Sequence, residues 1–272
     1  MDWFDESRLA HLLALLGFAA AFFYFIWKGR RGTQLYIRPI DALARMDDAV
    51  GRAAEMGRPL LFAPGLGSLT DPVTVAALAI LSRVAHNGAR LFTRTLVPNY
   101  EPLTWPVAQE VVRQSYLRAG HPDDFDPDDV VYLTSRNFTY AAATAGMMMR
   151  EKTATNFFVG HFYSESLILA ETGAATGALQ IAGTDSVEQI PFFITTCDAT
   201  MIGEEVFAAS ALVSDDPVSR SVVKAGDLCK VIILGIIAAG LAAAILLDWG
   251  PAGALGQKLA GILSAFRQGD WL

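Results

Sequence analysis

The stretch PLLFAPGLGSLTDPVTVAALAILSRVAH, residues 59–86, has the order of a strand, a glycine turn and a helix. Pro59 to Ala63 is short and apolar without polar alternation, which is typical of strands covered on both faces. Gly65 and Gly67 allow a sharp turn, and Val73 to His86 has the length of a crossover helix. We therefore predict a βα unit of an α/β domain.

The same order recurs along the chain. Further strand candidates are Ala89 to Thr95, Val130 to Thr134, Ala154 to Gly160, Ala178 to Gly183 and Pro191 to Thr196. Helix candidates are Trp105 to Arg118, Phe138 to Glu151, Ser164 to Thr172 and Met201 to Val213, and an amphipathic helix from Pro39 to Met56 precedes the first strand. This alternation predicts a doubly wound, mostly parallel, Rossmann-like sheet with right-handed crossovers.

Two apolar stretches bracket this α/β region, Leu9 to Trp27 and Val231 to Leu247. Each is close to the roughly 20 residues that a helix needs to cross a bilayer, so we predict two transmembrane helices. A cleaved signal peptide is the alternative for the first stretch and a buried core helix for the second. Small residues spaced for close helix contact in lipid occur in both stretches: Gly17 and Ala21 in the first, Gly235, Ala239 and Gly240 in the second.

Basic residues beside the spans predict the orientation, because Lys and Arg near span ends stay on the cytoplasmic side. They are Lys28, Arg30, Arg31 and Arg38 after the first span, and Arg220, Lys224 and Lys230 before the second. We expect an extracytoplasmic N-terminus (1–8), a membrane helix (9–27), a cytoplasmic α/β domain (28–228), a second membrane helix (229–248) and an extracytoplasmic tail (249–272). The tail has the spacing of an amphipathic helix, or of a disordered segment with a chance pattern.

Composition and residue spacing argue against binding of nucleic acid, zinc or calcium. The net charge of −7 and the lack of a basic run argue against nucleic acid. The two cysteines and four scattered histidines offer no zinc spacing. The acidic connection from Ala119 to Asp129 lacks the glycine and glutamate of an EF-hand loop, so we interpret it as solvated. We expect no metal and no cofactor.

Ligands of open parallel sheets lie beyond the carboxyl ends of the strands. Candidate binding residues there are Gly65, Gly67, Ser68, Arg94, Arg136, His161 and Ser164. If the strand order brings Arg94 and Arg136 near the glycine turns, a phosphate or carboxylate could rest on helix N-termini between guanidinium groups. The dinucleotide fingerprint is incomplete, because Thr70 stands where its third glycine belongs. The alternative is that the glycines only permit turns.

No complete catalytic arrangement is present, so no catalytic residue is assigned. His161, Ser164 and Glu165 are close in sequence, whereas nucleophile, base and orienting group normally come from different strands. Cys197 follows a strand candidate, yet nothing basic adjoins it to lower the pKa of its thiol.

Two runs carry a resemblance to a known family: Arg38 to Gly67, and Phe158-Val-Gly-His-Phe-Tyr-Ser-Glu165. They resemble a family of prokaryotic membrane-anchored proteins known only as a domain of unknown function, with similarity to about Thr184. The resemblance implies a bacterial or archaeal protein with a cytoplasmic Rossmann-like domain, and together with the two predicted spans it implies location in a prokaryotic inner membrane. It implies no activity and no catalytic residues.

These observations favour a non-enzymatic, membrane-anchored scaffold or accessory subunit, either a homo-oligomer or part of a larger membrane complex. The small and methionine residues of Phe138 to Glu151 predict a helix buried in the domain or at a subunit contact. The second hypothesis is a membrane-tethered sensor that binds a nucleotide or small anion at the strand ends. A hydrolase that uses Ser164, His161 or Cys197 ranks third.

Overall fold

The computed structural model describes residues 9–30, 38, 40–214 and 217–249. The chain forms two compact units, Tyr36–Arg220 and Met1–Leu35 with Ser221–Leu272. The predicted N-terminal segment 1–8 lies outside the described residues, as does the predicted tail from residue 250 onward.

The larger unit is an α/β domain. Its strands are β1 (Leu60–Ala63), β2 (Thr95–Asn99), β3 (Val130–Tyr132), β4 (Thr155–Val159), β5 (Leu179–Thr184) and β6 (Ala199–Ile202). Its helices are α2 (Asp41–Met56), α3 (Pro72–Arg90), α4 (Thr104–Ala119), α5 (Asn137–Glu151), α6 (Ser166–Ala175), α7 (Ile190–Thr196) and α8 (Glu204–Val213), with 3-10 turns η2 (Pro122–Asp124) and η3 (Pro127–Asp129).

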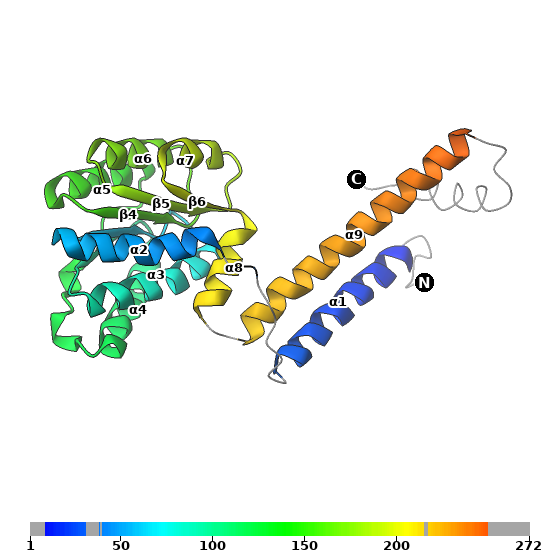
Figure 1. Cartoon of the computed structure of the whole chain (residues 1–272), viewed down its shortest axis with the longest axis horizontal. Helices are drawn as coiled ribbons and strands as arrows, with labels where there is room; N and C mark the ends of the chain where they lie inside the picture. Colours follow the sequence, from blue (N-terminus) through cyan, green and yellow to red (C-terminus); the bar gives the residue numbers. More distant parts are fainter. Residues whose placement is uncertain (1–8, 31–37, 39, 215–216, 250–272) are drawn as a thin grey trace, which may run out of the picture. The chain divides into compact units, whose positions relative to one another are not determined.

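The six strands form one sheet in the order β3-β2-β1-β4-β5-β6, and every pair is parallel. Helices α2, α3, α4 and α8 cover one face, and α5, α6 and α7 cover the other (Figure 1). The chain winds outward from β1 in one direction and from β4 in the other, so the switch point lies between these two strands. The predicted Rossmann-like sheet is confirmed.

Each central strand is buried on both faces. Leu60 and Phe62 point into the apolar cluster beside α2, α3 and α8, whereas Leu61 and Ala63 belong to the cluster beside α5, α6 and α7. Neighbouring residues of β4, Phe157 and Phe158, divide in the same way. Side chains of a strand alternate between its faces, so burial on both faces explains the unbroken apolar runs in the sequence.

The predicted strand Ala89 to Thr95 is wrong. Helix α3 continues to Arg90, and β2 begins only at Thr95. Gly88 lies inside the helix. A side chain at this position would crowd the neighbouring segment, because a Cβ atom would lie 3.0 Å from Thr95 Oγ1 and 3.2 Å from Thr93 O. The glycine thus permits close helix–sheet packing and does not end the helix.

The predicted strand Pro191 to Thr196 is also wrong. This run is helix α7, while β6 lies at Ala199–Ile202, where the predicted helix from Met201 should have begun. Periodicity cannot separate a short apolar strand from a short buried helix. Pro191 stands in the first turn of α7, a position where its missing N–H costs nothing.

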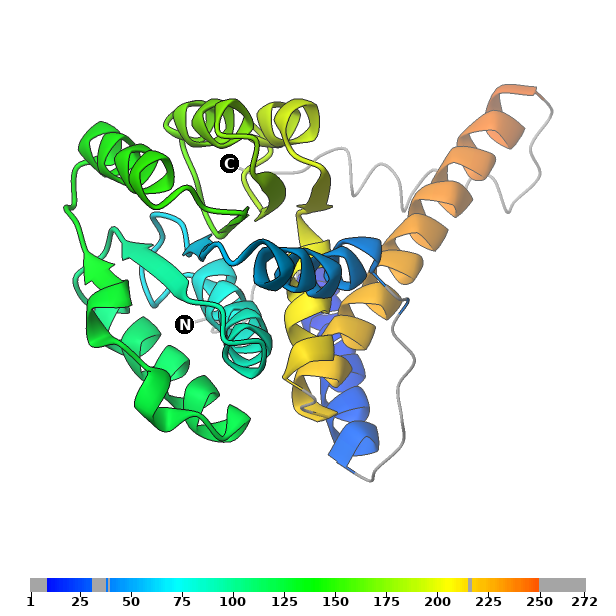
Figure 2. The same cartoon turned by 60° about the vertical axis from the view of Figure 1, so that its left-hand side comes forward.

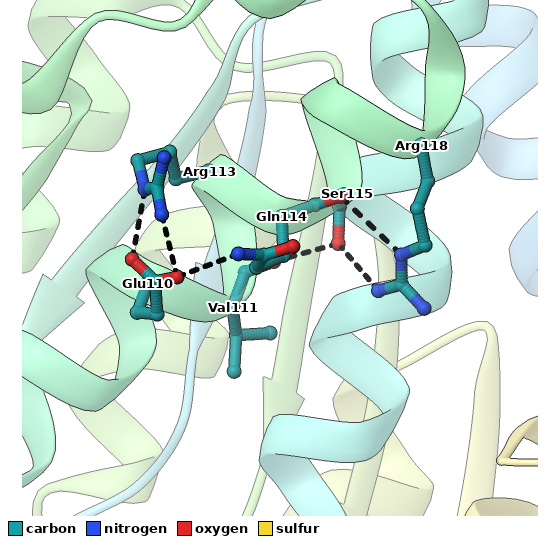
Figure 3. A network of polar contacts seen from close by, with 6 residues as sticks. All are labelled: Glu110, Val111, Arg113, Gln114, Ser115 and Arg118. Carbon is teal, nitrogen blue, oxygen red and sulfur yellow. Dashed lines mark hydrogen bonds and ion pairs between the residues drawn. The ribbon is translucent and has the colours of Figure 1, made fainter.

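Helix α4 carries a network of polar contacts along its length (Figure 3), in which Ser115 Oγ donates to Val111 O at 2.7 Å. The network extends to α3, because Arg118 Nη2 donates to Ser82 Oγ of that helix at 2.7 Å. On the outer side, Arg113 donates to both carboxylate oxygens of Glu110, which lowers the pKa of Glu110 to about 2. These contacts are typical of helix faces and helix pairs, so we assign the network a structural role.

The smaller unit contributes α1 (Leu9–Arg30) and most of α9 (Pro217–Trp249), so both predicted spans are helical. Figure 2 shows α9 as one uninterrupted helix. Of the part of the chain that the structure describes, one stretch is long and apolar enough to cross a membrane, Pro217–Ala243, with 27 residues and a mean hydropathy of 1.9. The apolar part of α1, Leu15–Gly29, is shorter, so the predicted pair of membrane helices is not confirmed.

The glycines of these two helices have no close neighbours in the space that a side chain would occupy. A Cβ atom added at Gly17, Gly235 or Gly240 would meet nothing within 4 Å. Helix contact through these glycines, Ala21 and Ala239 stays a prediction.

Candidate functional site

The candidate site lies at the carboxyl edge of the sheet, where the loops after β1 and β4 meet. Gly65 and Gly160 have φ values of 82° and 147°, which favour glycine. A Cβ atom at Gly65 would lie 2.6 Å from His161 O, and one at Gly160 would lie 2.1 Å from Pro64 O. The Leu66 N–H donates to His161 O at 2.8 Å. Both glycines are therefore required because two backbones touch at the switch point.

The glycine turn satisfies much of its own hydrogen bonding. The Ser68 N–H donates to Asp71 Oδ2 at 2.7 Å, and the Thr70 N–H donates to Ser68 Oγ at 3.3 Å. Dinucleotide sites instead offer such amides, with the start of the helix, to a pyrophosphate. Here a carboxylate takes the Ser68 amide, and Pro72 at the start of α3 has no N–H. This geometry favours a structural role for Gly65 and Gly67.

The predicted position of Arg94 at the carboxyl ends of the strands is wrong, so the condition for its meeting the glycine turns is not fulfilled. Arg94 precedes β2, so it lies at the amino edge of the sheet, opposite the switch point. Its guanidinium donates from Nε to Asp129 Oδ2 at 3.3 Å and from Nη2 to Asp129 Oδ1 at 2.5 Å. Asp129 is buried directly before β3. The pair thus joins the starts of two neighbouring strands, β2 and β3.

Arg136 lies at the carboxyl edge, but two strands separate its own strand from β4. It precedes α5 after the edge strand β3, and its side chain is exposed. Strands β2 and β1 separate β3 from β4. The structure therefore brings Gly65, Gly67, Ser68, His161 and Ser164 to neighbouring strand ends, without either arginine.

Cys197 and Asp198 also lie at the amino edge, because they follow α7 and precede β6. Asp198 Oδ2 accepts the Gln180 N–H at 2.8 Å, which fastens the start of β6 to β5. Burial raises the pKa of the Cys197 thiol to about 12. A buried thiol with so high a pKa, at the edge of the sheet opposite the carboxyl ends of the strands, is not suited to act as a nucleophile.

At the switch point, His161 pairs with Asp185. Their Nδ1 and Oδ1 atoms are 2.9 Å apart, and both side chains are partly exposed. The carboxylate accepts, so Nδ1 donates and the lone pair of a neutral ring lies on Nε2. The ring of Tyr163 meets the imidazole edge to face at 4.8 Å. In the described part of the chain, Ser164 is exposed and makes no hydrogen bond to His161, so no nucleophile–base pair forms.

Glu165 precedes α6 and was noted in the sequence only for its closeness to His161 and Ser164, without a binding role. It is fully buried. One carboxylate oxygen, Oε1, accepts the Tyr163 N–H at 2.7 Å. The other, Oε2, has no hydrogen-bond partner among the described residues. Buried carboxylates are costly unless paired, so a lone oxygen here marks a functional candidate.

Tyr100 is a residue of this edge that the sequence analysis missed. It directly follows β2, and its hydroxyl donates to Asn137 Oδ1 at 2.8 Å. Burial raises its pKa, with further contributions from the negative charges of Glu101 and Glu165. Tyr100 was missed because the predicted second strand ended at Thr95. Since β2 ends at Asn99, the next residue, Tyr100, belongs to the carboxyl edge of the sheet.

The described residues contain no group of three or more His, Cys, Asp or Glu side chains that could hold a metal ion. The site is instead an arrangement of carboxylates, one imidazole and tyrosines around the ends of β1, β2, β4 and β5.

Comparison with known proteins gives a family and nothing further. No curated protein and no solved structure matches the chain. The family match covers residues 1–250, which include the α/β domain and both long terminal helices. The chain therefore belongs to the family described as Domain of unknown function (DUF6754).

Proposed function

We propose that this chain is a membrane-anchored scaffold or accessory subunit whose α/β domain assembles with other subunits. The observation that carries the proposal is the apolar surface of α9. Exposed aliphatic side chains cover this helix: Val231, Ile232, Ile233, Leu234, Ile236, Ile237 and Leu241. A bilayer is the solvent that removes such a surface from water.

The second anchor in this proposal is α1. Its side chains Phe18, Phe23, Tyr24 and Trp27 are each more than half exposed. Lys28 follows at the end of this apolar stretch, with Nζ 6.0 Å from the centre of the Tyr24 ring. Aromatic and basic residues together are typical of a membrane–water interface. We propose a two-pass chain in a prokaryotic inner membrane, with the α/β domain in the cytoplasm and both termini outside.

An exposed apolar surface at the edge of the sheet supports assembly. Strand β3 is an edge strand, and Tyr132 at its end meets Trp105 of α4 with ring centres 6.4 Å apart. Leu103 and Phe138, beside the starts of α4 and α5, are 68% and 62% exposed. Edge strands and apolar surface groups are common in contacts between proteins.

Mass measurement of the full chain in mild detergent tests assembly. We expect a homo-oligomer or a complex with co-purifying subunits, and the double variant Leu103→Ser, Phe138→Ser to shift the mass toward the monomer. Val187→Ser is the matched control, because Val187 is 77% exposed on a different loop. A lone monomer of the wild-type chain would contradict the proposal.

Protease protection tests the orientation. In sealed, right-side-out cells we expect residues 28–228 to resist added protease and to become sensitive once the membrane is opened. Digestion of this segment in sealed cells would overturn the cytoplasmic assignment.

Binding of a small molecule at the carboxyl edge of the sheet is the second candidate function. The buried Glu165 carboxylate favours it, because Oε2 lacks a partner in the part of the chain that the structure describes. The nucleotide or small-anion form of this hypothesis receives no such support, since the Ser68 amide is already bonded to Asp71.

A further inference from the structure

One carboxylate oxygen of Glu165 accepts a hydrogen bond, and the other has no hydrogen-bond donor among the described residues. The Tyr163 N–H holds Oε1 at 2.7 Å, which fixes the carboxylate at the start of α6. Oε2 is shielded from water and has no protein donor among the residues described. A carboxylate accepts hydrogen bonds only, so the missing partner must be a donor.

The neighbouring charges are negative. Asp71 lies in the loop after β1, near His161: a Cβ atom at Gly67 would lie 3.0 Å from Asp71 Oδ2 and 3.5 Å from His161 Cβ. Asp185 pairs with the Nδ1 atom of the same histidine. Like charges repel an anionic ligand and attract a cationic one, most strongly where water is excluded.

Aromatic residues belong to the same loop as Glu165 or to the cluster that this loop packs against. Tyr163 belongs to the same loop as Glu165 and is half exposed, with its ring against His161. Tyr100 packs against the apolar cluster that contains Phe162, a residue of the same loop as Glu165, and its ring centre lies 5.7 Å from that of Tyr140. Tyrosine faces attract cations through their quadrupole, and a carboxylate with aromatic neighbours suits an ammonium group.

We propose that the loops after β2, β4 and β5 form a binding site for a small organic cation, whose ammonium group donates to Glu165 Oε2. Tyr100, Tyr163 and the pair of His161 with Asp185 are the other residues of the site. The site does not depend on membrane anchoring or on assembly, so its test is separate from theirs.

A matched set of four-carbon molecules tests the class of ligand. The probes are 1,4-diaminobutane, 1,4-butanediol and succinate, added to the full chain in detergent while its thermal unfolding is followed. A ligand that binds only the folded state raises Tm with concentration. We expect the diamine to raise Tm in a saturable manner and the diol and succinate to leave it unchanged.

Two glutamates of the same region provide the variant and its control. Glu165→Gln keeps the size of the side chain but removes its charge, and it should weaken diamine binding by about tenfold or more, since charge-assisted hydrogen bonds are the strong ones. Glu171→Gln, at an exposed position of α6, should bind as the wild type does.

Hydrogen exchange on the wild-type chain locates the site even if Glu165→Gln does not fold. Added diamine should slow exchange in residues 161–166 and 99–101 more than elsewhere in the domain. The proposal is overturned by an absent diamine effect, by an equal effect of the diol or succinate, by unchanged diamine binding in Glu165→Gln, or by protection confined to other segments.

Discussion

The imidazole of His161 and the carboxylate of Asp185 face each other across the ends of β4 and β5, with Nδ1 and Oδ1 2.9 Å apart. The two residues are 24 positions apart in sequence and meet because their strands are parallel neighbours. The same loop carries Gly160, which permits the backbone contact with the loop after β1, and Glu165, whose carboxylate is buried. One short segment after β4 therefore combines a close backbone contact, a His–Asp pair and a buried carboxylate.

Gly160→Ala is expected to be strongly destabilising. An added Cβ would lie 2.1 Å from Pro64 O, and φ of 147° is rarely adopted by alanine. We expect a loss of about 3 kcal/mol or more in the free energy of unfolding, from backbone strain together with overpacking. Urea unfolding of the full chain in detergent measures it.

Gly120→Ala is the matched control for this substitution. Gly120 has φ of 86°, but an added Cβ would meet nothing within 4 Å. Its expected cost is about 1–2 kcal/mol, because only the left-handed conformation is penalised. Equal losses at the two glycines would show that the loop contact is not tight.

Arg94→Ala is expected to destabilise the domain through Asp129. The substitution leaves a buried carboxylate without its two charge-assisted hydrogen bonds, at a cost of about 1–3 kcal/mol. Asp129→Asn should restore part of the loss, so the effects of the two single substitutions should not add. Strict additivity in this double-mutant cycle would contradict the pairing.

Asp129 also predicts a dependence of stability on pH. Burial raises its pKa above the ordinary value of 3.8, although Arg94 opposes the shift. The folded chain thus binds this proton more readily than the unfolded chain, so the stabilising contribution is present at low pH and is lost as pH rises through the raised pKa. Relative to Asp129→Asn, the wild-type free energy of unfolding should fall from about pH 4 upward. A parallel pH profile of the two proteins would contradict the direction of the shift.

Labelling of Cys197 with a thiol reagent should be slow in the folded chain. Burial raises its pKa to about 12, so little thiolate exists at neutral pH. Peptide mass spectrometry after timed labelling measures the rate, with the urea-unfolded chain as the reference. Fast labelling of the folded protein would restore Cys197 as a candidate nucleophile.

Ile236→Lys should weaken membrane retention. Ile236 is 62% exposed in the apolar part of α9, and a charge at the centre of a membrane helix costs about 2.5–3.5 kcal/mol. We expect a larger fraction of the chain to be extracted by alkaline carbonate. Val222→Lys, near the start of the same helix, is the control and should be retained as the wild type is.

The sequence predicted those elements whose pattern depends on local burial. Both faces of β1 and β4 contact apolar clusters, so their runs are uniformly apolar and their bounds were predicted within a residue or two. It failed at α7, where seven apolar and hydroxyl residues suit a helix as well as a strand. It failed at Gly88 for a different reason, because close packing against β2 and not the local sequence requires that glycine.

By itself, the sequence determined the α/β alternation, the family and the two apolar helices, because these properties follow from composition and spacing along the chain. Only the tertiary structure decided the strand order, and with it which edge of the sheet each polar residue occupies. It placed Arg94 with Asp129 at the amino edge, and His161 with Asp185 beside buried Glu165 at the carboxyl edge. The physical reason is that pairing between parallel strands joins residues distant in sequence, and no local pattern records which strands become neighbours.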